Sequence, residues 1–527
     1  MRATSFHWNR LPLQTIHNKR CSPISWHRLQ SDAKVNNVNI KSTVLRQQSN
    51  SNHNNDSSCE ESFGLYVHIP YCRRRCNYCD FAIVPIGDSG SGGDDEENNI
   101  RTVGFQKMDK EYKNALLNEI QWIGKSSHGK KIPLRSIYFG GGTPSLAPLS
   151  TLRDVMHDLL HSESAPFQLL EVDDDGTEPA EITIEMDPGT FDKQFLQSIK
   201  DCGFNRISLG AQSFDDNILS TMGRVHRSAD VYKSVKMISE VFGDDTNYSI
   251  DLISGVPRLT LAGWTEALHK AVSLRPKPRH ISVYDLQVES GTTFGKWYAD
   301  DMEDRDDDGG VAQLAASVSP ITTSLHPSLP SADDCAFMYR YASGYLRARN
   351  YEHYEISSYA LLDGNSMKSH RSKHNQIYWE IGGNWHAIGL GATSNVNGTR
   401  YSRPRALSDY IRWTKDLGGD DNNGLPWMSN SSEQDSDLNT ADEDDALLDI
   451  ILTRLRTKDG LDLDWIANHE KYGDSYVEAI MKGVKFFEGT ELVTVTPGRA
   501  KLTDPDGFLF SNNIISNIFA ELDDDSD

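Results

Sequence analysis

Three cysteines close together in the chain have the type and the spacing to do chemistry. Cys72, Cys76 and Cys79 form a C-x3-C-x2-C run directly after the apolar stretch Leu65–Ile69. Thiolates at this spacing most often bind a metal ion or an iron–sulfur cluster. Clusters with structural or electron-transfer roles usually have four protein ligands, so three cysteines leave one iron open. An open coordination position is where chemistry occurs, as it is at catalytic zinc sites.

Two other interpretations of these cysteines must be weighed. His68 could complete a Cys3His zinc site, although it lies in an extended segment before Pro70 and need not face the cysteines. Disulfides are disfavoured, because the chain of 527 residues has seven cysteines, a small and odd number. The spacing favours an iron–sulfur site over zinc.

The composition argues against some classes of function. The net charge of −23 disfavours broad nucleic-acid binding, because a phosphate backbone would be repelled. The acidic residues gather in runs that we interpret as solvated loops or tails. The hydrophobic share of 37% is low, and we attribute it to polar insertions rather than to a poor core. No apolar run approaches the length needed to cross a bilayer.

The N-terminal segment has the opposite charge character. Residues 1–50 carry arginines and lysines throughout, with Asp32 as the only acidic residue. A basic, serine-containing and acid-poor segment is typical of an organelle transit peptide, most simply a mitochondrial one. A plastid transit peptide and a disordered cytoplasmic tail are the alternatives.

Strands and helices alternate along the middle of the chain. The expected strands are Leu65–Ile69, Ser136–Phe139, Glu181–Glu185, Arg206–Leu209, Tyr248–Ile253 and His280–Leu286. The expected helices are Lys107–Ile123, Leu149–Leu160, Asp192–Cys202, Ser228–Val241 and Leu261–Leu274. Such alternation predicts parallel strands with right-handed crossovers, and six repeats predict an α/β fold with a partial (β/α)6 TIM-like barrel.

The rest of the chain is divided by polar insertions. A helix is expected at Ala336–Arg349, and helices followed by a hairpin at Leu492–Leu502 predict a mostly helical, winged-helix-like C-terminal domain. Its acidic surroundings argue against DNA binding. The expected boundaries are 1–60 for the transit and disordered segment, 61–300 for the barrel core, 301–333 for an insertion, 334–415 for a further region, 416–442 for an acidic linker, 443–519 for the C-terminal domain and 520–527 for an acidic tail.

Polar residues are expected at the carboxyl end of the barrel strands, where parallel α/β folds bind ligands. The second strand runs into the glycine-rich loop Gly140–Thr143, which allows a ligand to approach the backbone closely. Glu185, Gln212, Arg224 and Asp251 come at or after later strands. Together they offer acceptors for an amine or a ribose and a cation for a carboxylate.

Residues 63–290 resemble the core of the radical S-adenosylmethionine (SAM) superfamily in the cysteine run, the Gly-Gly-Thr-Pro loop and the Ile-Glu-x-x-Pro-Gly-Thr strand. The resemblance implies a [4Fe–4S] cluster on Cys72, Cys76 and Cys79, with SAM chelating the fourth iron and being cleaved to a 5′-deoxyadenosyl radical. It also implies that Tyr78 packs near the cluster. The implied SAM contacts are Tyr66, Gly141, Gly142, Thr143, Glu185, Gln212, Arg224 and Asp251.

Within that superfamily, Tyr354–Ala360 and the later H-N-x-x-Y-W motif resemble the oxygen-independent coproporphyrinogen III oxidase group. Phe81 stands where true oxidases carry a further cysteine, and the HemW-like heme chaperone branch has phenylalanine at this position. The motif is associated with heme binding in that branch, so the resemblance implies that His374, Tyr378 and Trp379 contact heme. A plain buried helix start is the alternative. One departure is Gly389–Asn395, where the family usually has a histidine.

The resulting prediction is a mitochondrial radical-SAM-type heme chaperone that passes heme to a hemoprotein. Coproporphyrinogen III oxidase activity is the rival, and another radical SAM reaction is a third possibility. The implied partners are heme, an acceptor hemoprotein and an electron donor, without nucleic acid. Peripheral membrane association and a homodimer are further possibilities.

Overall fold

The computed structural model describes residues 62–87, 96–127, 129–171, 179–298, 326–364, 368–417 and 439–524. The predicted transit segment 1–60 lies outside these ranges. So do most of the predicted insertion 301–333, most of the predicted linker 416–442 and the end of the predicted tail 520–527.

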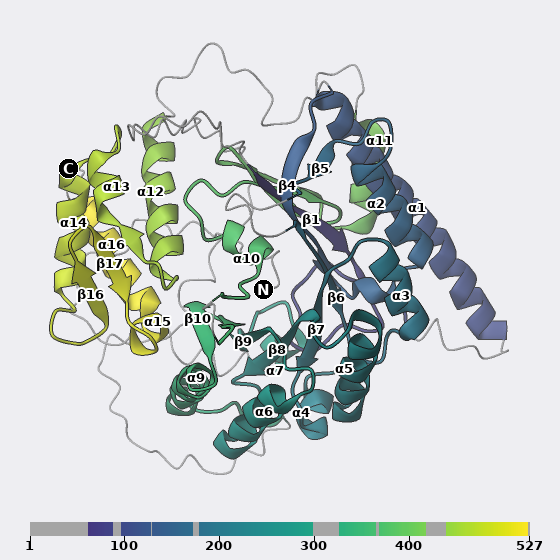
Figure 1. The fold of residues 1–527 in the computed structure, drawn as a ribbon, viewed down its shortest axis with the longest axis horizontal. Helices are drawn as coiled ribbons and strands as arrows, with labels where there is room; N and C mark the ends of the chain where they lie inside the picture. Colours follow the sequence, from purple (N-terminus) through teal and green to yellow (C-terminus); the bar gives the residue numbers. More distant parts are fainter. Residues whose placement is uncertain are drawn as a thin grey trace.

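A large curved sheet forms the centre of the molecule (Figure 1). Its strands lie in the order β10-β11-β9-β8-β7-β6-β4-β1-β12-β13-β14, with β5 beside β4. The strands from β1 to β9 along this path pair in parallel, which confirms the predicted α/β class. The predicted six are β1 (Phe63–Ile69), β4 (Ile132–Gly141), β6 (Glu181–Met186), β7 (Arg206–Gln212), β8 (Asn247–Ser254) and β9 (His280–Asp285).

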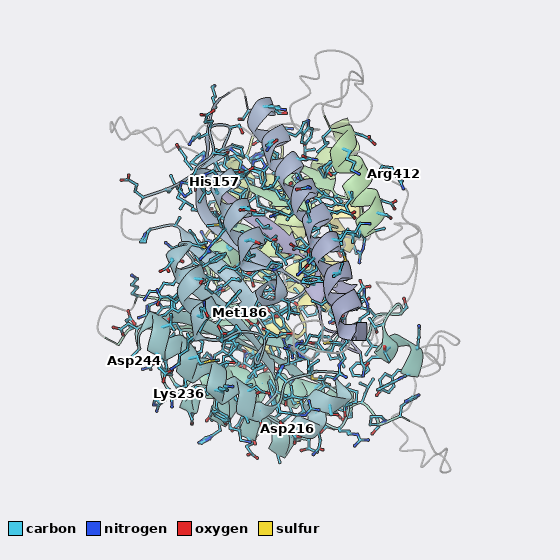
Figure 2. All side chains as sticks on the ribbon, turned by 90° about the vertical axis from the view of Figure 1, so that its right-hand side faces the viewer. His157, Met186, Asp216, Lys236, Asp244 and Arg412 are labelled. Carbon is cyan, nitrogen blue, oxygen red and sulfur yellow. The ribbon has the colours of Figure 1, made fainter. Side chains whose placement is uncertain are left out.

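Helices cover the outer face of this sheet (Figures 1 and 2). They are α1 (Glu96–Ser126), α2 (Leu149–Leu160), α3 (Lys193–Asp201), α4 (Asp216–Thr221), α5 (Ser228–Phe242) and α6 (Leu261–Ser273). Each strand turns its apolar residues, such as Ile137 and Phe139, into the core that it shares with these helices. Because side chains alternate along a strand, the intervening residues face inward. Those inward residues are mostly polar, for example Thr183 and Ser208, which are both buried.

The sheet extends beyond the six predicted strands at both edges. β12 (Trp385–Ile388) pairs in parallel with β1, and β13 (Thr393–Val396) and β14 (Thr399–Ser402) follow it in antiparallel order. At the opposite edge the hairpin of β10 (Tyr351–Glu355) and β11 (Ser358–Leu361) pairs with β9. The sequence pattern did not reveal β12, because a strand of only four residues carries little periodicity.

A short helix, α10 (Lys373–Ile377), packs against β4 and β1 and lines the interior of the barrel. Its first turn is held by Glu181 at the start of β6. The Glu181 carboxylate accepts hydrogen bonds from the Ser372 hydroxyl at 3.1 Å and from the His374 backbone N–H at 3.3 Å. Glu181 also lies 3.6 Å from Arg206, and both side chains are buried. α10 therefore closes the end of the barrel at which the strands begin.

The C-terminal module has a hydrophobic core of its own beside the barrel (Figure 1). Its helices are α12 (Asn439–Leu455), α13 (Leu463–Asn468), α14 (Asp474–Lys485), α15 (Asp506–Leu509) and α16 (Ser511–Asp524). The predicted hairpin is present as β16 (Val493–Thr496) and β17 (Arg499–Leu502), with β15 (Leu461–Asp462) as a third strand. A helical C-terminal region with a hairpin is thus confirmed.

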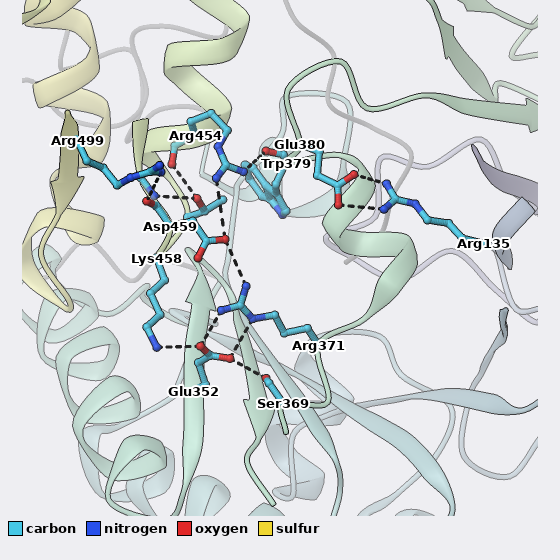
Figure 3. A network of polar contacts seen from close by, with 12 residues as sticks. Arg135, Glu352, Ser369, Arg371, Trp379, Glu380, Arg454, Lys458, Asp459 and Arg499 are labelled. Carbon is cyan, nitrogen blue, oxygen red and sulfur yellow. Dashed lines mark hydrogen bonds and ion pairs between the residues drawn. The ribbon is translucent and has the colours of Figure 1, made fainter. Parts of the chain in front are cut away.

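A charged network joins this module to the barrel (Figure 3). The Glu352 carboxylate on β10 accepts hydrogen bonds from Arg371 at 2.7 Å and from Lys458 of the C-terminal module at 2.8 Å. Burial opposes ionisation of Glu352, but hydrogen bonds from Arg371, Lys458 and Ser369 lower its pKa to about 2. Arg371 directly precedes the N-cap of α10, so the network fixes the chain where that helix begins.

The chain that leaves α10 is fixed by the same module. The guanidinium of Arg454 on α12 donates a hydrogen bond of 2.8 Å to the backbone oxygen of Trp379 (Figure 3). The next residue, Glu380, forms an ion pair with Arg135 on β4. Charged side chains therefore fix the chain on both sides of α10. Before the helix, the chain is bonded to the β10–β11 hairpin and the C-terminal module. After the helix, it is bonded to the C-terminal module and to β4.

A second buried ion pair fixes the opposite edge of the sheet. Arg403 and Glu119 are 2.7 Å apart and both side chains are fully buried. The same carboxylate accepts hydrogen bonds from the Gly389 backbone at 3.0 Å and from the Tyr410 hydroxyl at 2.7 Å. Tyr410 belongs to α11 (Leu407–Asp416). The pair thereby holds the chain after β12 against α1.

Loss of the Glu119 carboxylate should destabilise the fold strongly. In Glu119→Ala the Arg403 guanidinium stays buried without its partner, which should lower the free energy of unfolding by about 3–5 kcal/mol. Chemical unfolding followed by circular dichroism measures this difference. The matched control is Glu266→Gln, whose carboxylate pairs with Lys270 on an exposed helix face and should leave stability unchanged. Equal unfolding midpoints for the two variants would contradict the role assigned to Glu119.

Candidate functional site

The three cysteines line one open pocket that encloses about 560 Å³, solvent included. The pocket lies where β4 and β6 end, between the cysteine loop that follows β1 and the loop that follows α4. Its walls are made by Cys72, Arg73, Arg74, Cys76, Cys79, Ile83, Gly141, Gly142, Thr143, Leu146, Asp187, Pro188, Thr190, Gly223, Arg224, Val225 and His226. The predicted cysteines and glycine-rich loop are therefore brought together.

The cysteine loop is fastened to the loop that follows α4. The Arg74 guanidinium donates hydrogen bonds of 2.8 Å to the backbone oxygens of Gly223 and Arg224. The Asn77 backbone N–H donates to the Met222 oxygen at 3.0 Å. These bonds place the Arg224 side chain beside the cysteines.

Cationic and hydroxyl groups surround the thiols. The Arg224 Nη1 lies 3.5 Å from the Cys76 Sγ, and the Thr143 Oγ1 lies 3.7 Å from the Cys72 Sγ. Burial raises the pKa of the Cys72 thiol, which therefore stays protonated in the apoprotein. Cysteine binds a cluster as the thiolate, so cluster binding here would release protons.

The alternative Cys3His zinc site does not form. The His68 Nε2 is bonded to the Ala82 backbone oxygen at 2.8 Å, and its Nδ1 to the Tyr66 hydroxyl at 3.1 Å. Burial lowers the pKa of His68 to about 4, so its ring is neutral. Within the described ranges, no three His, Cys, Asp or Glu side chains are arranged to hold a single metal ion. A cluster differs, because each thiolate binds its own iron and the three need not meet at one point.

Glu185 faces the barrel interior next to the glycine-rich loop. Its carboxylate accepts a hydrogen bond of 2.8 Å from the Tyr138 hydroxyl and one of 3.1 Å from the Gly141 backbone N–H. Gly141 has a φ of +109°, and a Cβ there would lie 2.3 Å from the His68 ring. Only glycine can occupy this position, so the chain requires it to bring the loop to Glu185.

Asp187 is a site residue that the sequence reasoning missed. It forms an ion pair with Arg224 and accepts a hydrogen bond of 3.2 Å from the Thr143 hydroxyl. It comes two positions after Glu185, so strand alternation places both carboxylates on the inner face. The spacing of two residues from Glu185 is the feature of the sequence that could have identified Asp187 as a site residue.

Gln212 and Asp251 bring polar atoms without partners to the interior of the barrel. Among the described residues, the Gln212 Nε2 and the Asp251 Oδ1 are buried and make no hydrogen bond. The other Asp251 oxygen accepts from the Ser208 hydroxyl at 3.1 Å. Buried polar groups normally have partners, so these two atoms fit a polar ligand between them. An unfilled amide donor and an unfilled carboxylate oxygen are groups that can bind the hydroxyl and amino groups of a nucleoside such as that of SAM.

The predicted SAM residues fall into two sets, one in the wall of the cysteine pocket and one in the barrel interior. Gly141, Gly142, Thr143 and Arg224 line the cysteine pocket itself. Tyr66 lies further inside, where its ring stacks on that of Tyr138 with centroids 6.3 Å apart. Tyr78 lies beside Arg224, whose Nη1 is 3.4 Å from the phenol oxygen.

The H-N-x-x-Y-W motif lies elsewhere, on α10 and the two residues that follow it. The His374 ring is buried, and its Nδ1 and Nε2 are 2.9 Å from the Ser136 and Tyr378 hydroxyls respectively. Its ring stacks on Tyr138 with centroids 5.0 Å apart and an interplanar angle of 20°. Burial lowers the pKa of His374 to about 3, with further lowering by Arg206 and Arg135. The imidazole is neutral and both of its nitrogens are occupied.

A second cavity lies between part of α10 and the inner face of the sheet. It encloses about 270 Å³ and is lined by Tyr138, Arg206, Ser208, His280, Ser282, Ser372, His374, Asn375 and Tyr378. The His280 Nδ1 and the Asn375 Oδ1 have no partner there within the described part of the chain. Trp379 is buried too, directly after Tyr378. The predicted heme residues therefore stand apart from the cysteine pocket.

Comparison with known proteins identifies the family. Residues 66–271 match the radical SAM superfamily. The chain is 34% identical over 473 residues to the heme chaperone HemW of Synechocystis, covering 87% of this chain and 97% of that protein. The chain belongs to the HemW family. It is also 29% identical over 329 residues to a mitochondrial radical SAM domain-containing protein of Mus musculus, covering 62% of this chain and 59% of that one.

Among solved structures, coproporphyrinogen III oxidase HemN of Escherichia coli has the same fold as this HemW-family chain. The TM-score is 0.61 at 18% sequence identity, covering 87% of this chain and 90% of HemN. At this identity the likeness concerns the fold alone. The superfamily implies a [4Fe–4S] cluster and SAM, and the pocket offers three thiols and the Arg224 cation, which fit them. The unfilled polar atoms of Gln212 and Asp251 lie in the barrel interior, outside the lining of that pocket. None of the described helices has both the length and the apolar character needed to span a bilayer.

Replacement of single cysteines should separate ligands from bystanders. Cys72→Ser, Cys76→Ser and Cys79→Ser should each abolish the visible absorption and the iron content of anaerobically reconstituted protein. Cys202→Ser and Cys335→Ser are matched controls outside the pocket, in or beside α3 and α9 (Ala332–Arg347), and should reconstitute fully. A cluster that forms with only two of the three pocket cysteines, or that needs either control cysteine, would contradict the assignment.

Proposed function

We propose that this protein is a radical-SAM-type heme chaperone that binds heme and delivers it to a hemoprotein. The observation that carries the proposal is the HemW-family identity over 87% of the chain, because the relative it covers almost completely is a heme chaperone. Phe81 supports the chaperone proposal, because the resemblance implies that a true oxidase would carry a fourth cysteine at this position.

In this proposal Cys72, Cys76 and Cys79 hold the [4Fe–4S] cluster. When bound, the cluster and SAM supply one-electron chemistry. Arg224 provides the cation for the SAM carboxylate and is itself oriented by Asp187. The SAM pocket is completed by Tyr66, Gly141, Gly142, Thr143, Glu185, Gln212 and Asp251, with Tyr78 beside the cluster.

Heme is the cargo, and His374 with Tyr378 and Trp379 is its proposed contact. A neutral imidazole is a standard axial ligand of heme iron. The ring must first release a nitrogen, because the Ser136 and Tyr378 hydroxyls occupy both. A cavity of about 270 Å³ beside it is also too small for a macrocycle with its substituents. Heme binding at His374 therefore requires α10 to leave the barrel interior.

A second candidate is coproporphyrinogen III oxidase activity, the oxidative decarboxylation to protoporphyrinogen IX. The shared fold with HemN is the observation that favours it.

The mitochondrial relative supports a mitochondrial location, while the Synechocystis relative is compatible with plastid or cytoplasm. An electron donor and an acceptor hemoprotein are proposed partners, and a homodimer and peripheral membrane association are further proposals.

Two measurements on the anaerobically reconstituted full chain test the proposal. Titration with heme should give saturable binding, and His374→Ala should weaken it at least tenfold through loss of an axial ligand. The matched control is His157→Ala, an exposed histidine on α2 that should not alter heme binding (Figure 2). Incubation with coproporphyrinogen III, SAM and a reductant should yield no protoporphyrinogen IX.

The two outcomes are separable. Formation of protoporphyrinogen IX would overturn the chaperone assignment in favour of the oxidase. Heme binding that is equally tight in His374→Ala and in the wild type would instead remove His374 as the axial ligand.

A further inference from the structure

A continuous set of contacts connects α10 with the SAM end of the barrel. His374 stacks on Tyr138, with ring centroids 5.0 Å apart. The Tyr138 hydroxyl donates a 2.8 Å hydrogen bond to the Glu185 carboxylate. The other Glu185 oxygen accepts from the Gly141 N–H in the wall of the cysteine pocket. One tyrosine therefore contacts both the heme motif and the proposed SAM carboxylate.

Tyr138 is suited to orient a carboxylate. Its ring is buried and stacks with both Tyr66 and His374, which leaves it little rotational freedom. Burial and the nearby carboxylates of Glu185 and Asp251 raise the pKa of Tyr138 well above its usual value. The phenol is therefore a permanent hydrogen-bond donor near neutral pH. A hydrogen bond to a charged acceptor in a buried site is stronger than a neutral one.

The position of His374 is in turn set from outside the barrel. Ser136 and Tyr378 hold its ring, and Glu181 holds the first turn of α10. The charged network of Figure 3 ties the residues before and after α10 to the C-terminal module. How α10 is seated therefore depends on contacts that are far from the cysteines.

We propose that Tyr138 is a positioning residue for SAM: it orients the Glu185 carboxylate, and the stacked His374 ring holds Tyr138 in place. SAM affinity is then coupled to the seating of α10. The proposal rests on Glu185 being a SAM ligand. Where heme draws His374 away from Tyr138, heme and SAM weaken each other's binding by the same factor, since coupling between two binding sites is reciprocal.

The test is the SAM affinity of heme-free full-length protein, reconstituted with its cluster and kept without a reductant so that SAM is not consumed. Equilibrium dialysis with SAM gives the dissociation constant. Tyr138→Phe keeps the ring and removes the hydroxyl, and it should weaken SAM binding about tenfold. His374→Ala frees the Tyr138 ring and should weaken binding about threefold to tenfold. Ser136→Ala is a milder variant, which should shift affinity in the same direction.

The double variant distinguishes coupling from general damage. If His374 acts through Tyr138, then Tyr138→Phe combined with His374→Ala should bind SAM no more weakly than Tyr138→Phe alone. The matched control is Tyr359→Phe on β11, which also removes a buried tyrosine hydroxyl, one that has no partner among the described residues. Its SAM affinity should equal that of the wild type. Iron content and melting temperature confirm that each variant is folded and loaded.

The Glu185→Gln variant tests whether Glu185 binds SAM, separately from whether Tyr138 positions Glu185. Weak SAM binding by Glu185→Gln with wild-type affinity in Tyr138→Phe and His374→Ala would overturn the positioning role while keeping Glu185 as a ligand. Wild-type affinity in Glu185→Gln would overturn the premise and the proposal together. Fully additive losses in the double variant would show that His374 does not act through Tyr138.

Discussion

The inner face of the barrel sheet is polar and is shielded from bulk water. In most parallel sheets both faces are apolar. Here the inward residues include Thr183, Ser208, Asp251 and His280, all of them buried. A buried polar atom without a partner is costly, so every element near this face must either satisfy such atoms or leave room for something that does.

The two ends of the barrel meet this requirement differently. At the end where the strands begin, α10 supplies protein partners and bonds to Glu181, Ser136 and Tyr378. Among the described residues that line the cavity beside α10, only the buried His280 Nδ1 and Asn375 Oδ1 keep no partner. At the end where the strands finish, the cysteines line an open pocket, and Gln212 and Asp251 keep unfilled atoms in the barrel interior. The first end is closed by the chain itself, and the second is suited to a cluster and a nucleoside. Tyr138 lies between the two.

Much of this arrangement could be predicted from the sequence. Six strands and their helices follow from periodicity, and the cysteine run indicates a cluster because three ligand residues lie within one loop. Asp187 was missed because a single acidic residue at a strand end usually has a bland role, and its pairing with Arg224 joins positions distant in sequence. β12 was missed because its register with β1 is a long-range contact. For His374 the sequence left two interpretations open, heme contact or a plain buried helix start, because the H-N-x-x-Y-W motif gives the residue type and not its surroundings; in the structure His374 is buried at the start of α10.

Heme binding at His374 is proposed to release α10 from the barrel interior. Hydrogen–deuterium exchange of the segment from Ser372 to Tyr378, with and without heme, measures this release. We expect slow exchange in the heme-free protein, where α10 lies inside the barrel, and at least tenfold faster exchange once heme is bound. Unchanged slow exchange in heme-loaded protein whose heme spectrum depends on His374 would contradict it.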